Sequence, residues 1–266
     1  MNSNESVAES SEIVLPEFGS IELLDHYGDD LGVVNAARVS YGKESQWEYE
    51  LDKEVTFGFN LFGELSFLGE GVPGKRKLSD KDKGLLNYLF KHNHPSPLRH
   101  NGFTWRIKAP IFVVREIQKH VIATAMNEVS LRYSEAEEEF YIPAVENVRT
   151  QVGKPGDYYY EQIDPNDAFS GLSHLKDSYE YAWDTYQKLL KLGWAKEQAR
   201  MVLPVGVYST IWFSGNANCM LNFFALRSES DAQKEIQLYS QAMEKEFKKI
   251  MPETYEAWNN NGRGKL

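Results

Sequence analysis

The spacing of apolar residues changes along this chain, from every second residue to every third or fourth, and this change constrains the fold most. Phe103, Trp105 and Ile107 alternate with polar residues, as in a half-buried strand. The strand is expected to end at Pro110, with a helix beginning near Ile111. A short strand is also expected around Ile21.

Helical spacing dominates the second half of the chain. One apolar stripe should stop at Gly193, and it consists of Tyr179, Trp183, Tyr186 and Leu190. Further helices are expected over residues 195–202 and 216–226, and after Ser230, whose Ser-x-x-Gln spacing resembles a capping box.

Two helices are expected in the first half of the chain. Asp29 and Asp30 should open one, and Ser79 should cap the other. The buried face of the second would consist of Leu85, Leu86, Tyr88 and Leu89.

The predicted fold class is α+β, a mainly antiparallel sheet packed with long helices in a single domain. The 266 residues are enough for a large core. Residues 1–12 are polar and are predicted to form a flexible N-terminal tail, and residues 13–266 to form the domain, with insertions near residues 42–77 and 147–170.

Charge and cysteine content limit the class of protein. A formal net charge of −10 opposes binding to nucleic acid or to an anionic membrane, so an anionic ligand would need a local basic pocket. Cys219 is the only cysteine, which suits a reducing compartment. With no leader-like start and no long apolar run, the protein is expected to be cytoplasmic.

Polar and apolar residues alternate from Met126 to Tyr133. If this stretch is extended, Glu128, Ser130 and Arg132 share one face and could hold a phosphate. An edge strand with solvated charges is the alternative.

Basic residues and histidines form two further groups. Arg115 and Lys119 would share a helical face that could bind an anion, while Glu116 and His120 could form a surface pair. His92, His94 and His100 lie close together, but their spacing does not favour a metal site, and none is predicted.

Two arginines in the last third of the chain and the single cysteine are the remaining candidate functional residues. Arg200 and Arg227 lie near predicted helix ends, where they could bind a ligand or satisfy carbonyl groups. Cys219 stands among bulky apolar residues without an adjacent base, so a buried, inert thiol is predicted.

Taken together, these segments resemble the flavin-dependent thymidylate synthases from about Ile21 to Trp258. The resembling segments are residues 29–31 and 36–40; His92-x-His94-x-Ser96-Pro97; Phe103-Thr104-Trp105 with residues 108–113; Asn127-Glu128-x-Ser130-x-Arg132-Tyr133-Ser134; residues 139–143; Glu197-x-x-Arg200-x-Val202-Leu203-Pro204; and Leu221-Asn222-Phe223-x-x-Leu226-Arg227.

The resemblance implies roles for individual residues. Ser130, Arg132 and Arg200 would bind the phosphate of dUMP, and Glu128 and Glu116 would belong to the same nucleotide site. Arg227 would stabilise negative charge on the uracil. Arg227 and Ser130 are the expected catalytic residues. The residues expected around FAD are Ser40, His94, Ser96, Lys119, His120, Asn216 and Asn222.

The resemblance also implies partners. Methylenetetrahydrofolate would donate the one-carbon unit, NADPH would reduce the flavin, and a homotetramer would build its active sites at subunit interfaces. Three positions depart from the family: Lys119-His120-Val121 replaces Arg-His-Arg with one extra residue before Ser130, Asn218 replaces an arginine, and Arg99 replaces a glutamate. FAD would then sit differently, bind more weakly, or require compensation from Arg99 or Arg115.

Two alternatives follow from those departures. The product could be a hydroxymethylated pyrimidine nucleotide, or the chain could be a catalytically silent nucleotide-binding homologue.

Overall fold

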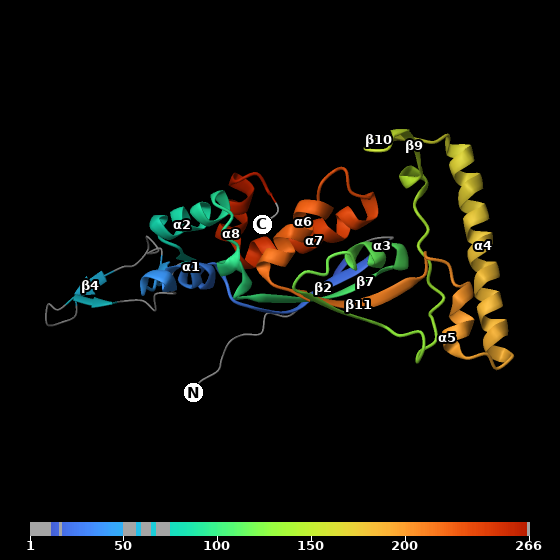
Figure 1. Ribbon diagram of the computed structural model, residues 1–266, viewed down its shortest axis with the longest axis horizontal. Coiled ribbons are helices and arrows are strands. Elements are labelled where there is room, and N and C mark those ends of the chain that lie inside the picture. The colour runs from blue at the N-terminus through green and yellow to red at the C-terminus, as the bar shows by residue number, and fades with distance from the viewer. Residues whose placement is uncertain (1–11, 16–17, 50–56, 60–64, 68–74, 265–266) are drawn as a thin grey trace. The chain divides into compact units, whose positions relative to one another are not determined.

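The computed structural model describes residues 12–15, 18–49, 57–59, 65–67 and 75–264 (Figure 1). Most of the expected N-terminal tail therefore lies outside the described residues. The fold class is α+β with a mainly antiparallel sheet and long helices, as predicted. The chain forms two compact units, each built from three segments that are separated in sequence.

The first unit comprises Met1–Asp25, Phe103–Gly215 and Leu226–Met243. Its five-stranded sheet has the order β1-β2-β7-β11-β8. The strands are β1 (Ile13–Leu15), β2 (Gly19–Tyr27), β7 (Gly102–Pro110), β8 (Thr124–Glu128) and β11 (Tyr208–Gly215). β1 pairs with β2, and β11 pairs with both β7 and β8, all antiparallel. The strand predicted over residues 103–107 is confirmed.

Alternation along β7 and β11 gives the sheet two different faces. Phe103, Trp105 and Ile107 are fully buried, and each contributes about 1.5–3 kcal/mol through burial. The helix α3 (Ile111–Ile117) begins where predicted and lies against β11 (Figure 1). On the opposite face, Trp212 is 54% exposed and pairs in register with Arg106.

The predicted insertion near residues 147–170 contains a hairpin and the start of a long helix. After the short 3-10 helix η3 (Val145–Asn147), β9 (Arg149–Lys154) pairs with β10 (Asp157–Gln162). The helix α4 (Pro165–Lys191) follows, and Gly193 at a φ of 86° lies just beyond its end, as predicted. The helix α5 (Lys196–Ala199) packs beside α4 and continues into η4 (Arg200–Val202) (Figure 1).

The second unit comprises His26–Gly102, Asn216–Ala225 and Glu244–Leu266. Asp29 caps α1 (Asp30–Arg38) through the amide of Gly32, and Ser79 caps α2 (Asp80–Lys91) through the amide of Asp82, so both predicted starts are confirmed. α2 packs against α8 (Pro252–Asn260). The short elements η1 (Val39–Tyr41) and η2 (Ser96–Arg99) follow α1 and α2.

Two details of this region differ from prediction. On α2 the buried residues include Leu86, Leu89 and Phe90, whereas Tyr88 is 52% exposed, because its ring packs over His92 instead of the core. Within the predicted excursion 42–77, the described parts pair as β3 (Glu48–Tyr49) with β6 (Arg76–Lys77) and β4 (Phe57–Phe59) with β5 (Leu65–Phe67).

The last predicted helices are α6 (Ala217–Arg227) and α7 (Lys234–Ile250). The capping box predicted at Ser230 is wrong, since α7 begins at Lys234 and the amide of Gln237 bonds to the carbonyl of Gln233. On α7 the apolar residues Ile236, Tyr239, Met243 and Phe247 are all buried. Within the described parts of the chain, no helix is both long and apolar enough to cross a membrane.

Candidate active site

A cavity of about 670 Å³ opens in the first unit at the end of β8. Its walls come from α3, from the segment 128–131 that leaves β8, and from the segment 197–207 that contains η4. The volume falls within the range of small-molecule sites, about 300–1,000 Å³. Among the predicted site residues, Glu128, Ser130 and Arg200 line it together.

Glu128 is the last residue of β8, and its carboxylate is held from two sides. The Ser209 hydroxyl donates to Oε1 over 2.8 Å, and Gln118 Nε2 donates to Oε2 over 3.3 Å. Both oxygens act as acceptors, so the carboxylate is oriented before any ligand arrives. Sequence alone could not reveal Ser209 and Gln118, because their approach depends on the pairing of β11 with β8 and on where α3 ends.

Ser130 lies in a turn rather than in a strand. The amide of Val129 still bonds to the carbonyl of Thr210, but the amides of Tyr133 and Ser134 both bond back to the Ser130 carbonyl. The predicted extended stretch is therefore wrong beyond Glu128, because the chain folds back after the last sheet hydrogen bond. Glu128 and Ser130 nevertheless border the same cavity.

Arg132 reaches the edge of this site through an ion pair. Its Nε donates to Oε2 of Glu197 over 2.9 Å, with the two side chains 54% and 50% exposed. Glu197 lines the cavity, whereas Arg132 is not among the lining residues. An exposed pair of this kind is weak, about 0–1 kcal/mol, so a phosphate could replace Glu197 as the partner of Arg132.

Arg227 ends α6 and contacts both members of the predicted Glu116–His120 pair. Its Nη1 donates to Oε2 of Glu116 over 2.8 Å, and its Nε donates to Nε2 of His120 over 3.1 Å. Burial raises the pKa of Glu116; the Arg227 guanidinium opposes that rise, and Glu235 adds to it. The side chains of Arg227 and Glu116 are only 22% and 23% exposed, so the three groups form a partly desolvated cluster.

The predicted helical face shared by Arg115 and Lys119 does not exist. α3 ends at Ile117, and Lys119 lies beyond the cap residue Gln118. Arg115 lines the 670 Å³ cavity, whereas Lys119 is exposed elsewhere.

The residues predicted around FAD divide between the two units. Lys119 and His120 belong to the first, and the remaining five belong to the second: Ser40, His94, Ser96, Asn216 and Asn222. Ser40, His94 and Ser96 are exposed. The Asn216 side chain accepts from the amide of Cys219 over 3.0 Å at the start of α6.

Cys219 is 7% exposed. Burial raises the pKa of its thiol, while the side-chain Oδ1 of Asn216 accepts from its Sγ over 3.1 Å. A protonated, buried thiol is a poor nucleophile, as the sequence predicted.

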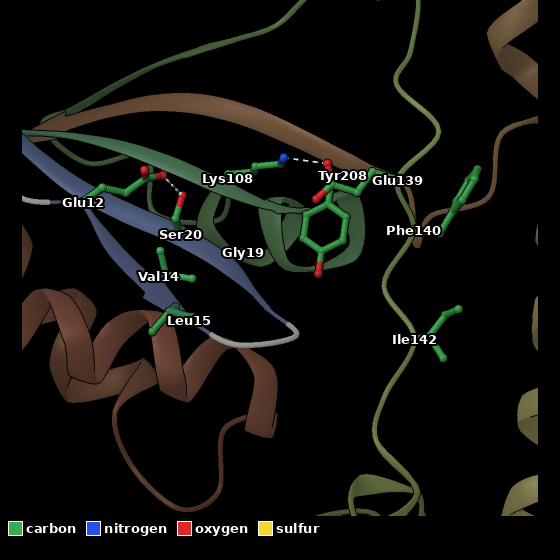
Figure 2. A pocket seen from close by; sticks show the side chains of 10 residues that line it. All are labelled: Glu12, Val14, Leu15, Gly19, Ser20, Lys108, Glu139, Phe140, Ile142 and Tyr208. Atoms are coloured by element: carbon green, nitrogen blue, oxygen red, sulfur yellow. Dashed lines mark hydrogen bonds and ion pairs between the residues drawn. The ribbon is translucent and has the colours of Figure 1, made fainter.

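A second cavity of about 460 Å³ lies beside β1 and the ends of β7 and β11 (Figure 2). Lys108 pairs with Glu139 across it, and the Ser20 hydroxyl bonds to Glu12 (Figure 2). Lys108, the one cation among the described residues that line this cavity, is thus already neutralised. In contrast, neither Arg115 nor Arg200 forms an ion pair with a residue that the structure describes, so the larger cavity is the better site for an anion.

Comparison with known proteins gives a consistent result. Residues 22–253 match the family model described as thymidylate synthase complementing protein. A flavin-dependent thymidylate synthase from Streptomyces avermitilis is 36% identical over 259 residues, which cover 93% of this chain and 95% of that protein. One from Kosmotoga olearia is 38% identical over 251 residues, which cover 94% of each.

Solved structures show the same likeness. The UMP/dUMP methylase PolB from Streptomyces cacaoi bound with 5-Br UMP superposes with a TM-score of 0.75 at 32% identity, covering 94% of this chain and all of that one. Its complex with 5-Br dUMP gives a TM-score of 0.74 at 33% identity, covering 92% of this chain and 97% of that one.

Proposed function

The chain belongs to the thymidylate synthase complementing protein family, and from that membership we propose that this enzyme methylates dUMP to dTMP as a flavin-dependent thymidylate synthase. The observation that carries the proposal is the 670 Å³ cavity, which gathers Glu128, Ser130 and Arg200 at its walls. Its cations suit a phosphate, and its volume suits a nucleoside monophosphate.

The phosphate would be bound at the turn that follows β8. Arg200 and Ser130 both line the cavity, and their guanidinium and hydroxyl groups would donate to the phosphate; Arg132 would join them when it leaves Glu197. Glu128 would accept hydrogen bonds from the nucleotide, because its oxygens are already oriented by Ser209 and Gln118.

Arg227 would lie against the uracil, where it stabilises negative charge as C5 becomes nucleophilic. Glu116 and His120 hold its guanidinium in place, so little reorganisation is needed when charge develops. Glu116 would thus act at the nucleotide site mainly by positioning Arg227. No protein nucleophile is required, which agrees with the protonated thiol of Cys219.

The second unit carries groups that fit a flavin. Asn218 Oδ1 on α6 is buried, and no described residue donates to it. An unsatisfied buried acceptor costs about 1–3 kcal/mol, and the imide N–H of a flavin ring could satisfy it. Asn222 follows four residues later on the same helix. Further proposed contacts to FAD are Ser40, His94, Ser96 and Asn216 of this unit, and Lys119 and His120 of the first unit.

Bound FAD would carry hydride from NADPH to the one-carbon unit that methylenetetrahydrofolate supplies. The protein's own task is to hold the uracil, neutralise its charge and exclude water around C5.

A homotetramer is the proposed assembly, with active sites at subunit interfaces. The open face of the sheet supports it, because Trp212 is 54% exposed there beside Arg106 and Asn127. Aromatic and arginine side chains are enriched at protein interfaces. Light scattering of the purified protein measures the mass directly.

A second candidate substrate is UMP. The similarity to a protein described as a UMP/dUMP methylase favours it. Comparing kcat/KM for UMP and dUMP separates the two substrates, and the mass of the product separates methylation from hydroxymethylation by one oxygen atom.

Flavin and nucleotide binding provide the first test of the proposal. We expect a yellow protein, or one that gains flavin absorbance on addition of FAD, and we expect calorimetric binding of dUMP that Arg200→Ala weakens. A colourless protein that binds neither ligand would reject the proposal. Binding of dUMP without flavin or turnover would instead support the silent homologue.

A further inference from the structure

Arg115 occupies a fixed position in the wall of the 670 Å³ cavity. It lies in the last turn of α3, whose first two residues are tied by their amides to the segment 205–207, with Ile111 bonding to Val207 and Phe112 to Val205, both over 3.0 Å. Val113, Val114 and Ile117 are buried on the other side of this helix. The backbone of Arg115 is therefore anchored, while its side chain borders the cavity.

The carboxylates around the cavity have partners other than Arg115, so Arg115 can bind an anionic ligand. The lining carboxylates are Glu128 and Glu197. Glu128 accepts hydrogen bonds from Ser209 and Gln118, and Glu197 is paired with Arg132. On α3 itself, the neighbouring Glu116 is paired with Arg227. Arg115 has no ion pair with any residue in the described part of the chain.

Arg200, which also lines the cavity, likewise has no ion pair with a residue that the structure describes. It lies in η4. Two arginines line this one cavity without an ion pair to any described residue, and together their charges match that of a phosphate dianion. At this site Arg132 already forms an ion pair with Glu197, whereas Arg115 forms no ion pair with a described residue.

We propose that Arg115 is a further phosphate-binding residue of the nucleotide site, acting with Arg200 and Ser130. The inference rests on the proposed nucleotide-binding function. The proposed role explains why an arginine stands in the last turn of α3 although no described carboxylate pairs with it there. Arg115 also supplies a guanidinium that the segment Lys119-His120-Val121 lacks.

Calorimetry and ligand-observed NMR can test this role with two ligands that differ only in the phosphate. Arg115→Ala should weaken dUMP binding about 10- to 100-fold, the range expected for a charge-assisted hydrogen bond. Binding of 2′-deoxyuridine should change by less than about twofold, because that ligand has no phosphate. Arg115→Lys should fall between, since lysine keeps the charge and loses the planar fork.

Arg149→Ala provides the matched control. Arg149 lies in β9 outside the cavity, where its guanidinium stacks over Tyr160 at 4.7 Å, so its removal should leave dUMP binding unchanged. Circular dichroism of both variants checks that they fold.

The outcomes separate this inference from the function on which it rests. Unchanged dUMP binding in Arg115→Ala would refute the role of Arg115 and leave the proposed function standing. Equal losses for dUMP and 2′-deoxyuridine would also refute it, because the effect would not depend on the phosphate. A wild-type protein that binds no dUMP would overturn the proposed function itself.

Discussion

Arg227 and Glu116, 111 residues apart in sequence, meet through a 2.8 Å hydrogen bond between Nη1 and Oε2. The second contact of Arg227, to His120 Nε2, completes a cluster that holds the guanidinium at the end of α6. A cation fixed in this way can stabilise developing negative charge without first being reorganised. The proposed role of Arg227 in turnover depends on this arrangement.

Replacing Arg227 should remove most of the turnover. Arg227→Ala deletes the positive charge expected at the uracil, and the loss in kcat should be about 100- to 1,000-fold, as for other preorganised electrostatic groups. Steady-state formation of dTMP at saturating substrate measures it. A kcat within about threefold of wild type, in a folded variant, would contradict the electrostatic role.

Cys219 gives the contrasting case. Cys219→Ala should keep kcat within about twofold, because a buried thiol whose pKa is raised is not a nucleophile. Its removal should lower the free energy of unfolding by about 1 kcal/mol through lost packing. Urea unfolding and the same turnover assay check both parts, and losses in turnover as large as those of Arg227→Ala would refute the division of roles.

Releasing Arg132 should strengthen nucleotide binding. Glu197→Gln removes the carboxylate that pairs with Arg132 at 2.9 Å and takes one negative charge from the cavity wall. The pair is half exposed, so the gain in dUMP affinity should be modest, about two- to fivefold. Calorimetry measures the gain. Weaker binding would mean that Glu197 itself supports the nucleotide.

A buried carboxyl in the second unit should make stability depend on pH. Asp30 is 1% exposed, its oxygens accept from the amides of Glu253 and Thr254, and burial raises its pKa from 3.8 to about 6. The folded state therefore binds more protons than the unfolded state between about pH 4 and about pH 6, so this group's contribution to stability falls as pH rises through that window.

Asp30→Asn removes this titration. Relative to wild type, the variant should gain up to about 3 kcal/mol of stability as pH rises from about 4 to about 7. Chemical denaturation of both proteins across that range measures the difference. A difference that does not change with pH would show that Asp30 keeps the same pKa when the chain unfolds.

Local patterns predicted the parts of the fold that local interactions determine. Asp29 and Ser79 cap their helices through amides three residues ahead, and the alternation in β7 reports one buried face. These features need no knowledge of distant residues. The same reasoning failed at Ser130, because alternation does not reveal where the pairing between β8 and β11 stops.

Long-range contacts explain why the candidate site in the structure differs from the one predicted from the sequence. The residues that hold Glu128 come from α3's cap and from β11, and the partners of Arg227 lie more than a hundred positions upstream. Arg115 and Lys119 were expected to share a face, but α3 ends at Ile117, where no strong stop signal appears in the sequence. The identities of the site residues could thus be proposed from the sequence, whereas their pairings could not.

Product analysis tests the central claim most directly. The purified protein is incubated with dUMP, methylenetetrahydrofolate, NADPH and FAD, and the nucleotide is examined by mass spectrometry, with each component omitted in turn. The account predicts dTMP only when dUMP, methylenetetrahydrofolate, NADPH and flavin, whether bound on purification or added, are all present, and a strong loss of dTMP with Arg200→Ala. Absence of dTMP from the complete mixture, in a protein that has bound flavin and dUMP, would contradict it.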